Sequence, residues 1–175
     1  MVTQTPSYTR VRIRPIRSDD RDALSAFYAA LSPESRFARF HAVTRGIGED
    51  AVGLLCGPDH EHGEGFVAEP LDVEPGGARI IGHLCLDPAA GPAIEMAVAV
   101  ADVWQGHGIG RALLHAAVDW ARTHGISRLQ ASALSTNSAV LGLIASVGRP
   151  VRESAPSAGV VVATIDVGAP QPQAA

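Results

Sequence analysis

Residues 95–111 read EMAVAVADVWQGHGIGR, an apolar strand pattern that leads through a glycine-rich loop into a helix. Three glycines, Gly106, Gly108 and Gly110, fall within five residues of this loop. Glycine lets the backbone approach a ligand closely, and the free amides of a first helical turn attract an anion to the same place. The stretch therefore predicts a phosphate-binding loop between a strand and a helix.

Two widespread nucleotide-binding fingerprints do not match this loop. The dinucleotide fingerprint requires glycine where Arg111 stands, and an acidic residue about 20 residues further on, where Gln130 and Leu134 lie instead. The P-loop requires a lysine, and the chain contains none. A phosphate ligand of another kind is expected, and a tight helix start that binds nothing is the alternative.

Length and composition indicate one folded domain. The chain has 175 residues, of which 46% are hydrophobic and 18% are charged. No apolar run reaches the roughly 20 residues of a membrane helix, and the first ten residues lack the apolar centre of a signal peptide. Cys56 and Cys85 are expected as reduced thiols. We therefore expect a soluble, cytoplasmic protein without a membrane partner.

The formal net charge is −4, so nucleic acid is not an expected partner. The charges are unevenly spread along the chain. Five arginines crowd the N-terminal region. Between Arg45 and Arg79 the sequence has eight acidic residues and neither arginine nor lysine. This acidic segment is interpreted either as a solvated loop region or as a field that attracts a cationic substrate.

Strand and helix patterns alternate along the rest of the chain. Helices are expected over residues 18–31, from Pro33 onward, near residues 50–55, and over residues 108–124 and 138–147. Strands are expected over residues 11–16, 65–69, 78–87, 93–101, 128–134 and 159–167. Such interleaving predicts an α/β or α+β fold around one sheet.

The glycine-rich loop resembles the pyrophosphate loop of the GNAT superfamily of N-acetyltransferases, Gln/Arg-x-x-Gly-x-Gly/Ala, which Gln105 to Gly110 fit. Leu113 and Leu114 continue that resemblance. A second family motif, Asn-x-x-Ala-x-x-Leu-Tyr followed by Gly-Phe, is similar to a later segment at Asn137, Val140, Leu143, Ile144, Gly148 and Arg149. The segment from Leu31 to Phe40 resembles the acetyltransferase domains of bacterial protein-lysine acetyltransferases.

The resemblance implies a mixed, mostly antiparallel sheet of about six to seven strands flanked by about four helices. It implies one acetyltransferase domain over residues 10–167, followed by a flexible tail over residues 168–175. It also implies acetyl-CoA as co-substrate, without a metal. The residues expected to bind it are Val98, Val100, Gln105, Gly106, His107, Gly108, Ile109, Gly110, Arg111 and Asn137.

Acetyl transfer to an amine needs the neutral amine, and a lysine amine has a pKa of about 10.4. Glu95 is the candidate general base, because it lies in the strand that leads to the loop, where relatives often place a glutamate. An idle, exposed carboxylate is the alternative, and Asp87 and Asp102 are weaker candidates. The family's tyrosine acid is missing, since Ile144 occupies its place.

Three functions remain open at this point. The first is acetylation of protein lysines, and the second is acetylation of a small-molecule amine. The third is a non-catalytic acyl-CoA-binding module, which the missing tyrosine and Arg149 in place of the motif's phenylalanine would fit. The expected assembly is a monomer or homodimer. His60 and His62 could contact a metal, but on an acidic loop they are more typical of polar surface.

Overall fold

The computed structural model describes residues 10–72, 77–89 and 93–168. The N-terminal half contains β1 (Val11–Pro15), the 3₁₀ turn η1 (Ser18–Asp20), α1 (Arg21–Ala30), α2 (Pro33–Phe40), α3 (Glu49–Leu55) and β2 (Glu64–Pro70). The chain continues through β3 (Gly82–Pro88), β4 (Ile94–Val100), η2 (Asp102–Trp104), α4 (Ile109–Thr123) and β5 (Arg128–Leu134). It ends with α5 (Ser138–Ala145), β6 (Val151–Glu153) and β7 (Val160–Asp166). The expected tail lies outside the described residues except for Gly168.

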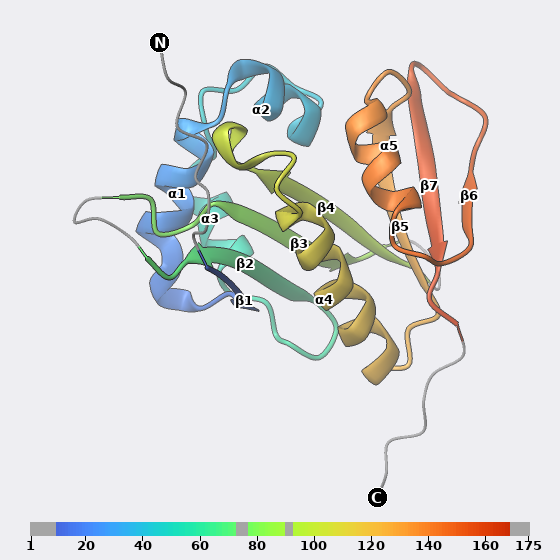
Figure 1. The fold of residues 1–175 in the computed structure, drawn as a ribbon, viewed down its shortest axis with the longest axis horizontal. Helices are drawn as coiled ribbons and strands as arrows, with labels where there is room; N and C mark the ends of the chain where they lie inside the picture. The colour runs from blue at the N-terminus through green and yellow to red at the C-terminus, as the bar shows by residue number, and fades with distance from the viewer. Residues whose placement is uncertain (1–9, 73–76, 90–92, 169–175) are drawn as a thin grey trace, which may run out of the picture.

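The strands form one seven-stranded sheet in the order β1-β2-β3-β4-β5-β7-β6. Every neighbouring pair is antiparallel except β4 and β5, which are parallel and are joined through α4. Helices α1 and α3 pack on one face of the sheet and α4 and α5 on the other (Figure 1). The mixed, mostly antiparallel sheet predicted from the sequence is confirmed.

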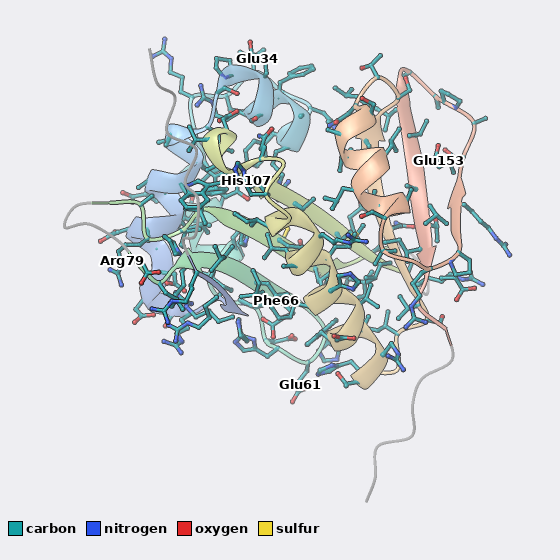
Figure 2. The ribbon with its side chains drawn as sticks, viewed as in Figure 1. Glu34, Glu61, Phe66, Arg79, His107 and Glu153 are labelled. Carbon is teal, nitrogen blue, oxygen red and sulfur yellow. The ribbon has the colours of Figure 1, made fainter. Side chains whose placement is uncertain are left out.

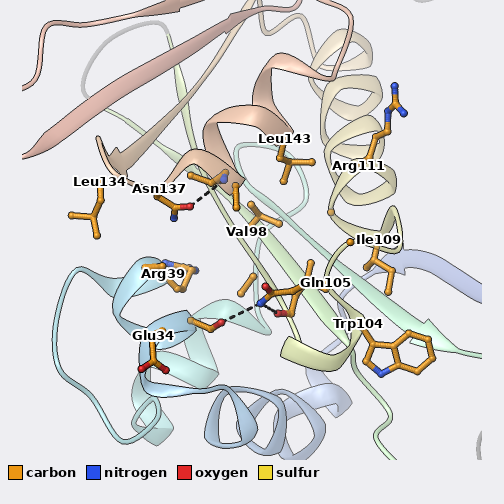
Figure 3. Close-up of a pocket in the computed structure, with 18 of the residues that line it drawn as sticks. Glu34, Arg39, Val98, Trp104, Gln105, Ile109, Arg111, Leu134, Asn137 and Leu143 are labelled. Carbon is orange, nitrogen blue, oxygen red and sulfur yellow. Dashed lines mark hydrogen bonds between the residues drawn. The ribbon is translucent and has the colours of Figure 1, made fainter. Parts of the chain in front are cut away.

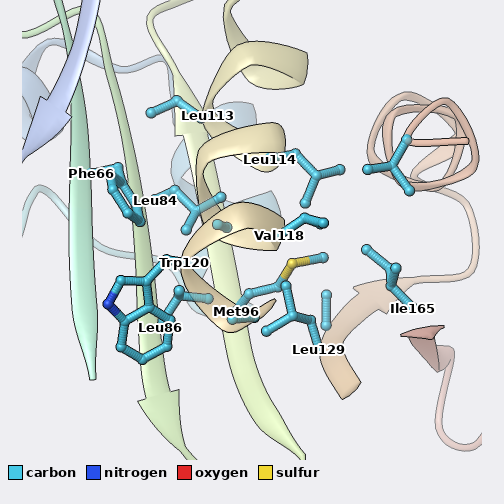
Figure 4. Packing of buried hydrophobic residues seen from close by; sticks show 14 of the residues in the cluster. Phe66, Leu84, Leu86, Met96, Leu113, Leu114, Val118, Trp120, Leu129 and Ile165 are labelled. Atoms are coloured by element: carbon cyan, nitrogen blue, oxygen red, sulfur yellow. The ribbon is translucent and has the colours of Figure 1, made fainter. Parts of the chain in front are cut away.

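Helix α4 is the centre of the larger core. Leu113, Leu114, Ala117 and Val118 are at most 3% exposed, and they face Leu84, Leu86 and Met96 on the sheet (Figure 4). Burying a leucine side chain contributes about 1.5–3 kcal/mol. The amphipathic pattern of this helix therefore fixes its rotation, and with it the direction in which its first turn points.

The parallel pair β4–β5 separates after two residue pairs. The strands are paired at Ile94 with Leu129 and at Glu95 with Gln130, and then diverge. β5 continues instead along β7, from Arg128 to Leu134. Beyond Glu95, the side of β4 that faces β5 has no strand partner, so its backbone groups are available to another extended molecule.

Charged residues that are far apart in sequence pair at the β1–β2 edge. Arg14 contacts both Asp20 and Glu69, Arg12 contacts Glu69, and Arg10 contacts Asp72. The N-terminal arginines and part of the acidic segment thus neutralise each other. Glu61 lies away from the gap between α2 and α5 (Figure 2). The ion pairs at the β1–β2 edge reduce the net charge of the acidic segment. Glu74 of that segment lies outside the described residues.

The Arg14–Asp20 pair predicts an acid-sensitive contribution to stability. Hydrogen bonds from Arg14, both 2.7 Å long, lower the pKa of Asp20. A carboxyl whose pKa is lower in the folded state stabilises the fold above its unfolded pKa of about 3.9, and that contribution disappears as the pH falls through the folded value. Asp20→Asn should therefore cost about 2 kcal/mol at pH 7, with the difference from the parent chain shrinking below pH ~4.

Urea unfolding followed by circular dichroism at pH 7 and pH 3 measures this difference. The matched control is Asp119→Asn, because Asp119 is exposed on α4 and forms no ion pair in the described part of the chain. An equal destabilisation by Asp20→Asn at both pH values would contradict the assignment.

Three elements differ from the sequence prediction. The strand expected over residues 78–87 is β3, which begins only at Gly82. The first helix was expected from Ser18, but a 3₁₀ turn occupies residues 18–20 and α1 begins at Arg21. Asp20 turns its carboxylate back to Arg14 and to the backbone N–H of Arg17, so the chain tightens before the α-helix starts. β6 was not predicted, because three residues that pair only with β7 carry too short a pattern.

Candidate active site

A cavity of about 690 Å³ opens at the splay between β4 and β5 (Figure 3). Its walls are α2, the end of β4, the loop before α4, the first turn of α4, and the start of α5. A narrower space of about 30 Å³ continues between β4 and β5. Among the predicted cofactor residues, the cavity is lined by Val98, Val100, Gln105, Gly106, Gly108, Ile109, Gly110, Arg111 and Asn137.

The loop before α4 presents unpaired backbone donors to this cavity. The first backbone amide that bonds within this helix is that of Ala112, which donates to the Gly108 carbonyl over 3.0 Å. Within the described residues, none of the amides of residues 106–111 has a hydrogen-bond acceptor. Six free N–H groups in and just before the first turn of a fifteen-residue helix are an arrangement that favours an anion.

Glycine is required at two positions of this loop. Gly106 and Gly108 have φ values of 75° and 82°, in the left-handed region that side chains with a Cβ rarely adopt. A Cβ at either position would meet no atom within 4 Å, so backbone conformation rather than packing selects glycine there. Gly110 differs, because a Cβ there would lie 3.0 Å from Leu143 on α5.

A hydrogen-bonded clamp ties α2 to the same loop. Asp102 accepts from the backbone N–H of Ser32 (2.9 Å), the Ser32 hydroxyl (2.7 Å) and the Ser35 hydroxyl (2.7 Å). Gln105 donates to the Ser35 hydroxyl and to the Val100 carbonyl, both over 3.1 Å. Partial burial alone would raise the pKa of Asp102, but the bonds from Ser35 and Ser32 lower it. Asp102 is thus an anchor for α2, not a free base.

Asn137 caps α5 at the edge of the cavity. Its side-chain oxygen accepts from the Val140 amide over 3.1 Å, which is an N-cap bond. Its amide nitrogen has no partner in the described structure and remains available on the cavity wall. The sequence carried this signal, since asparagine directly before an apolar helical run is typical of an N-cap.

The two remaining loop side chains point differently. Arg111 is exposed on the cavity rim, and its guanidinium donates to the Ser146 carbonyl at the end of α5 over 3.4 Å. His107 does not line the cavity. Its ring bonds the Gln105 carbonyl over 2.8 Å and packs edge-on against Trp104. Only the backbone of His107 can therefore face a ligand on the loop.

Glu95 lies where β4 and β5 part. Its carboxylate accepts from Gln130 Nε2 over 2.9 Å, from the Ser132 hydroxyl over 3.1 Å and from the Ser132 backbone N–H over 3.3 Å. Its partner on β3 is Asp87, which is exposed. Glu95 does not line the larger cavity, but Met96, Ala97 and Ser132 beside it line the narrower space. A carboxylate has about four acceptor sites, and these three bonds leave one of them open.

A polar cluster lies beneath α2. The Tyr28 hydroxyl and Nδ1 of the fully buried His83 are hydrogen-bonded over 2.8 Å, and Arg39 Nη2 donates to Cys85 Sγ over 3.2 Å. Burial lowers the pKa of His83 to about 3, so this ring is neutral at physiological pH. His83, whose direction the sequence left open, belongs to the core. Arg39 lines both spaces of the site.

The sequence did not single out several residues of the site. Trp104 and Leu134 line the cavity without belonging to a motif, and Ser35 and Arg39 line it from the Leu31–Phe40 segment, to which no site role was assigned. The family resemblance of that segment gave Arg39 no role in the site, because one arginine on an amphipathic helix is usually solvated. In the described residues, no group of three or more histidine, cysteine or acidic side chains is arranged to hold a metal ion. No helix there is long and apolar enough to cross a membrane.

Comparison with known proteins adds to this geometry. Residues 21–148 match the model of the acetyltransferase (GNAT) family. The chain is 30% identical over 142 residues to the acetyltransferase PA5475 of Pseudomonas aeruginosa, covering 79% of this chain and 74% of that one. The GNAT domain of S. lividans PAT is 29% identical, with a TM-score of 0.78 over 89% of this chain and 90% of that domain.

A more distant solved structure has the same fold. It is yncA of Salmonella typhimurium, whose structure contains its cofactor acetyl-CoA; it is 21% identical, with a TM-score of 0.70 over 93% of this chain and 98% of that one. The family match spans the cavity, the free amides and both strands of the splay. The chain therefore belongs to the acetyltransferase (GNAT) family and is an acetyl-CoA-dependent acyltransferase.

Proposed function

We propose that this protein transfers the acetyl group of acetyl-CoA directly to the side-chain amine of a lysine in another protein. The diphosphate lies on the free amides of residues 106–111, and the pantetheine arm runs along the unpaired side of β4. The backbone near Val98 and Val100 would bind that arm, although the Val100 carbonyl already accepts from Gln105. Asn137 contributes its free amide nitrogen from the opposite wall.

The position of Glu95 carries the proposal. Its carboxylate stands where the splay closes, with Asp87 opposite on the neighbouring strand. Two carboxylates there favour an ammonium group, and Glu95 is fixed by Gln130 and Ser132. The neighbouring alanines Ala97, Ala131 and Ala133 line a narrow gap, which excludes a bulky or branched arm and so favours a slim one such as the lysine side chain.

Glu95 supplies the deprotonation that the reaction needs. Removing a proton from a lysine ammonium at pH 7 costs roughly 4–5 kcal/mol, given a pKa of about 10.4. The carboxylate takes this proton, directly or through one water, and passes it to solvent. The neutral nitrogen then attacks the thioester carbon. A C–N bond forms, the C–S bond breaks with its electron pair on sulfur, and the new amide loses its second proton to water.

The rim of the cavity supports a macromolecular acceptor. Phe37 lines the cavity on α2 and is 42% exposed, while Val103, in the 3₁₀ turn that the clamp joins to α2, is 74% exposed. Large exposed apolar side chains beside a functional cavity are typical of a surface that contacts another protein.

Incubation of a cell lysate with the enzyme and isotopically heavy acetyl-CoA tests the acceptor. Mass spectrometry should find heavy acetyl groups on lysines of a limited set of proteins. The chain itself contains no lysine, so acetyl-lysine in the products cannot come from the enzyme. If no protein is labelled while a panel of small amines releases free CoA, the acceptor is a small molecule and the proposal fails.

The clamp between α2 and the loop gives a prediction about binding. Asp102→Ala removes three hydrogen bonds that hold the N-terminus of α2 against the loop. We expect acetyl-CoA to bind about tenfold more weakly, a loss of about 1.4 kcal/mol. Isothermal titration measures the affinity, and hydrogen exchange should show faster exchange in α2. Asp119→Ala on the exposed face of α4 is the control, and unchanged affinity in Asp102→Ala would refute the role of the clamp.

A further inference from the structure

The guanidinium of Arg39 stands where the two spaces of the site meet. Arg39 lines the large cavity together with Val98 and Asn137, and the narrow gap together with Met96 and Ala97. Figure 3 shows it on the α2 side of the cavity, across from Asn137. A strand rises about 3.3 Å per residue, so an extended arm that leaves the loop beside Val100 covers about 13 Å by Met96. The far end of such an arm therefore comes beside Arg39.

The positive charge of Arg39 has no counter-ion in contact. Its Nη2 donates to Cys85 Sγ, and its Nε is buried without a partner. Across the described residues it forms no ion pair with a carboxylate. Burial raises the pKa of Cys85 to about 11 and that of Tyr28 to about 12, so both neighbours are neutral at pH 7. A largely buried cation without an anion is costly, which favours an anionic ligand.

The side of Arg39 that faces away from the cavity is packed against other side chains. The Tyr28–His83 pair lies under it, and its guanidinium carbon stands 4.9 Å from the centre of the Phe40 ring. The cavity is the side from which a ligand can reach it. The titratable groups on the surrounding elements are Tyr28 on α1, Glu34 on α2, His83, Cys85 and Asp87 on β3, and Glu95 on β4.

We propose that Arg39 stabilises the negative charge that develops on the coenzyme A sulfur as the thioester bond breaks. When the C–S bond breaks, its electron pair stays on sulfur, and the guanidinium pairs with the resulting thiolate without giving up a proton. The tyrosine that the family motif places on α5 is replaced here by the buried Ile144. This inference rests on the proposed placement of the cofactor but not on the identity of the acceptor.

The experiment titrates the thiol of bound CoA in a complex without acceptor. The ultraviolet absorbance of the thiolate is followed against pH for the parent chain, Arg39→Gln and Arg39→Lys, each also carrying Cys85→Ala and each corrected for the free enzyme. A free thiol has a pKa of about 8.5. In the parent chain we expect a midpoint lowered by about 1–2 pH units, because a cation in contact favours the thiolate. Arg39→Lys should retain part of this shift, and Arg39→Gln should lose it.

A CoA analogue that lacks the sulfur serves as the binding control. It should bind the parent chain and Arg39→Gln equally, because it carries no charge for Arg39 to stabilise. A thiol midpoint in Arg39→Gln equal to that of the parent chain overturns the proposal. Failure of CoA to bind the parent chain would overturn the cofactor placement as well, whereas labelling of small amines alone would change only the acceptor and leave this result standing.

Discussion

Glu95→Gln should lower kcat/KM at pH 7 by about 10²–10³-fold, within the usual contribution of a general base. Glutamine keeps an oxygen that can accept from Gln130 or Ser132, but it cannot take a proton. The lost rate should return as the pH rises toward the amine pKa of about 10.4, since solvent then supplies the neutral nucleophile. Release of free CoA with a saturating amine, measured from pH 6 to pH 10, gives the profile.

Two comparisons make the Glu95 result specific. Asp87→Asn removes the carboxylate opposite Glu95 and should reduce the rate much less, because Asp87 is exposed and lies on β3, one strand further than Glu95 from the place where β4 and β5 separate. Acetyl-CoA affinity should be unchanged in both variants. If Glu95→Gln retained the parent rate and the parent pH profile, Glu95 would be only a structural bridge between β4 and β5.

Gly108→Val should abolish most acetyl-CoA binding, with a loss of about 100-fold. Valine is strongly disfavoured at a φ of 82°, so the loop must change conformation and turn its amides away from the cavity. Losing one or two hydrogen bonds to a charged phosphate costs about 1.5–3 kcal/mol each. Isothermal titration with acetyl-CoA measures the loss, and a thermal melt checks that the variant folds.

Gly159→Val is the matched control for Gly108→Val. Gly159 also has a positive φ, 79°, and open space around its Cα, but it lies beside β7 and does not line the cavity. Both variants should lose comparable stability, because the backbone strain is the same. Only Gly108→Val should lose affinity, and similar affinity in the two variants would show that the loop amides do not bind the phosphates.

Elements of the fold were predictable from the sequence where a single hydrophobic pattern ran through the whole segment. The apolar stripe of α4 and the alternation in β5 predicted these elements to within one residue at each end. The separation of β4 from β5 was not visible in the same way. This separation depends on where the hydrogen-bonded pairing of the two strands stops, which is at Glu95. The contact between Glu95 and Ser132 marks the place, but the two residues are 37 positions apart in the sequence, so no local pattern predicts it.

The position of the glycine-rich loop on the cavity wall was predictable from the sequence. Closely spaced glycines such as Gly106, Gly108 and Gly110 indicate that the backbone can approach a ligand closely, whatever the surrounding residues are. All three line the cavity. Side-chain roles were harder to predict. Gln105 faces α2 as well as the cavity, Asn137 uses its oxygen as a cap, and the environment of Arg39 depends on Tyr28 and Cys85, which lie on other elements. Burial and tertiary contacts decide such roles, and the spacing of residues along the sequence reveals neither.

The attachment of α2 to the loop through Asp102, Ser35 and Gln105 has a consequence for the order of events. Helix α2, one wall of the groove proposed to receive the amine, is hydrogen-bonded to the loop whose backbone is proposed to bind the diphosphate. If acetyl-CoA binds this loop as proposed, its binding would also order the wall that contacts the acceptor, and we then expect acetyl-CoA to bind first and CoA to leave last.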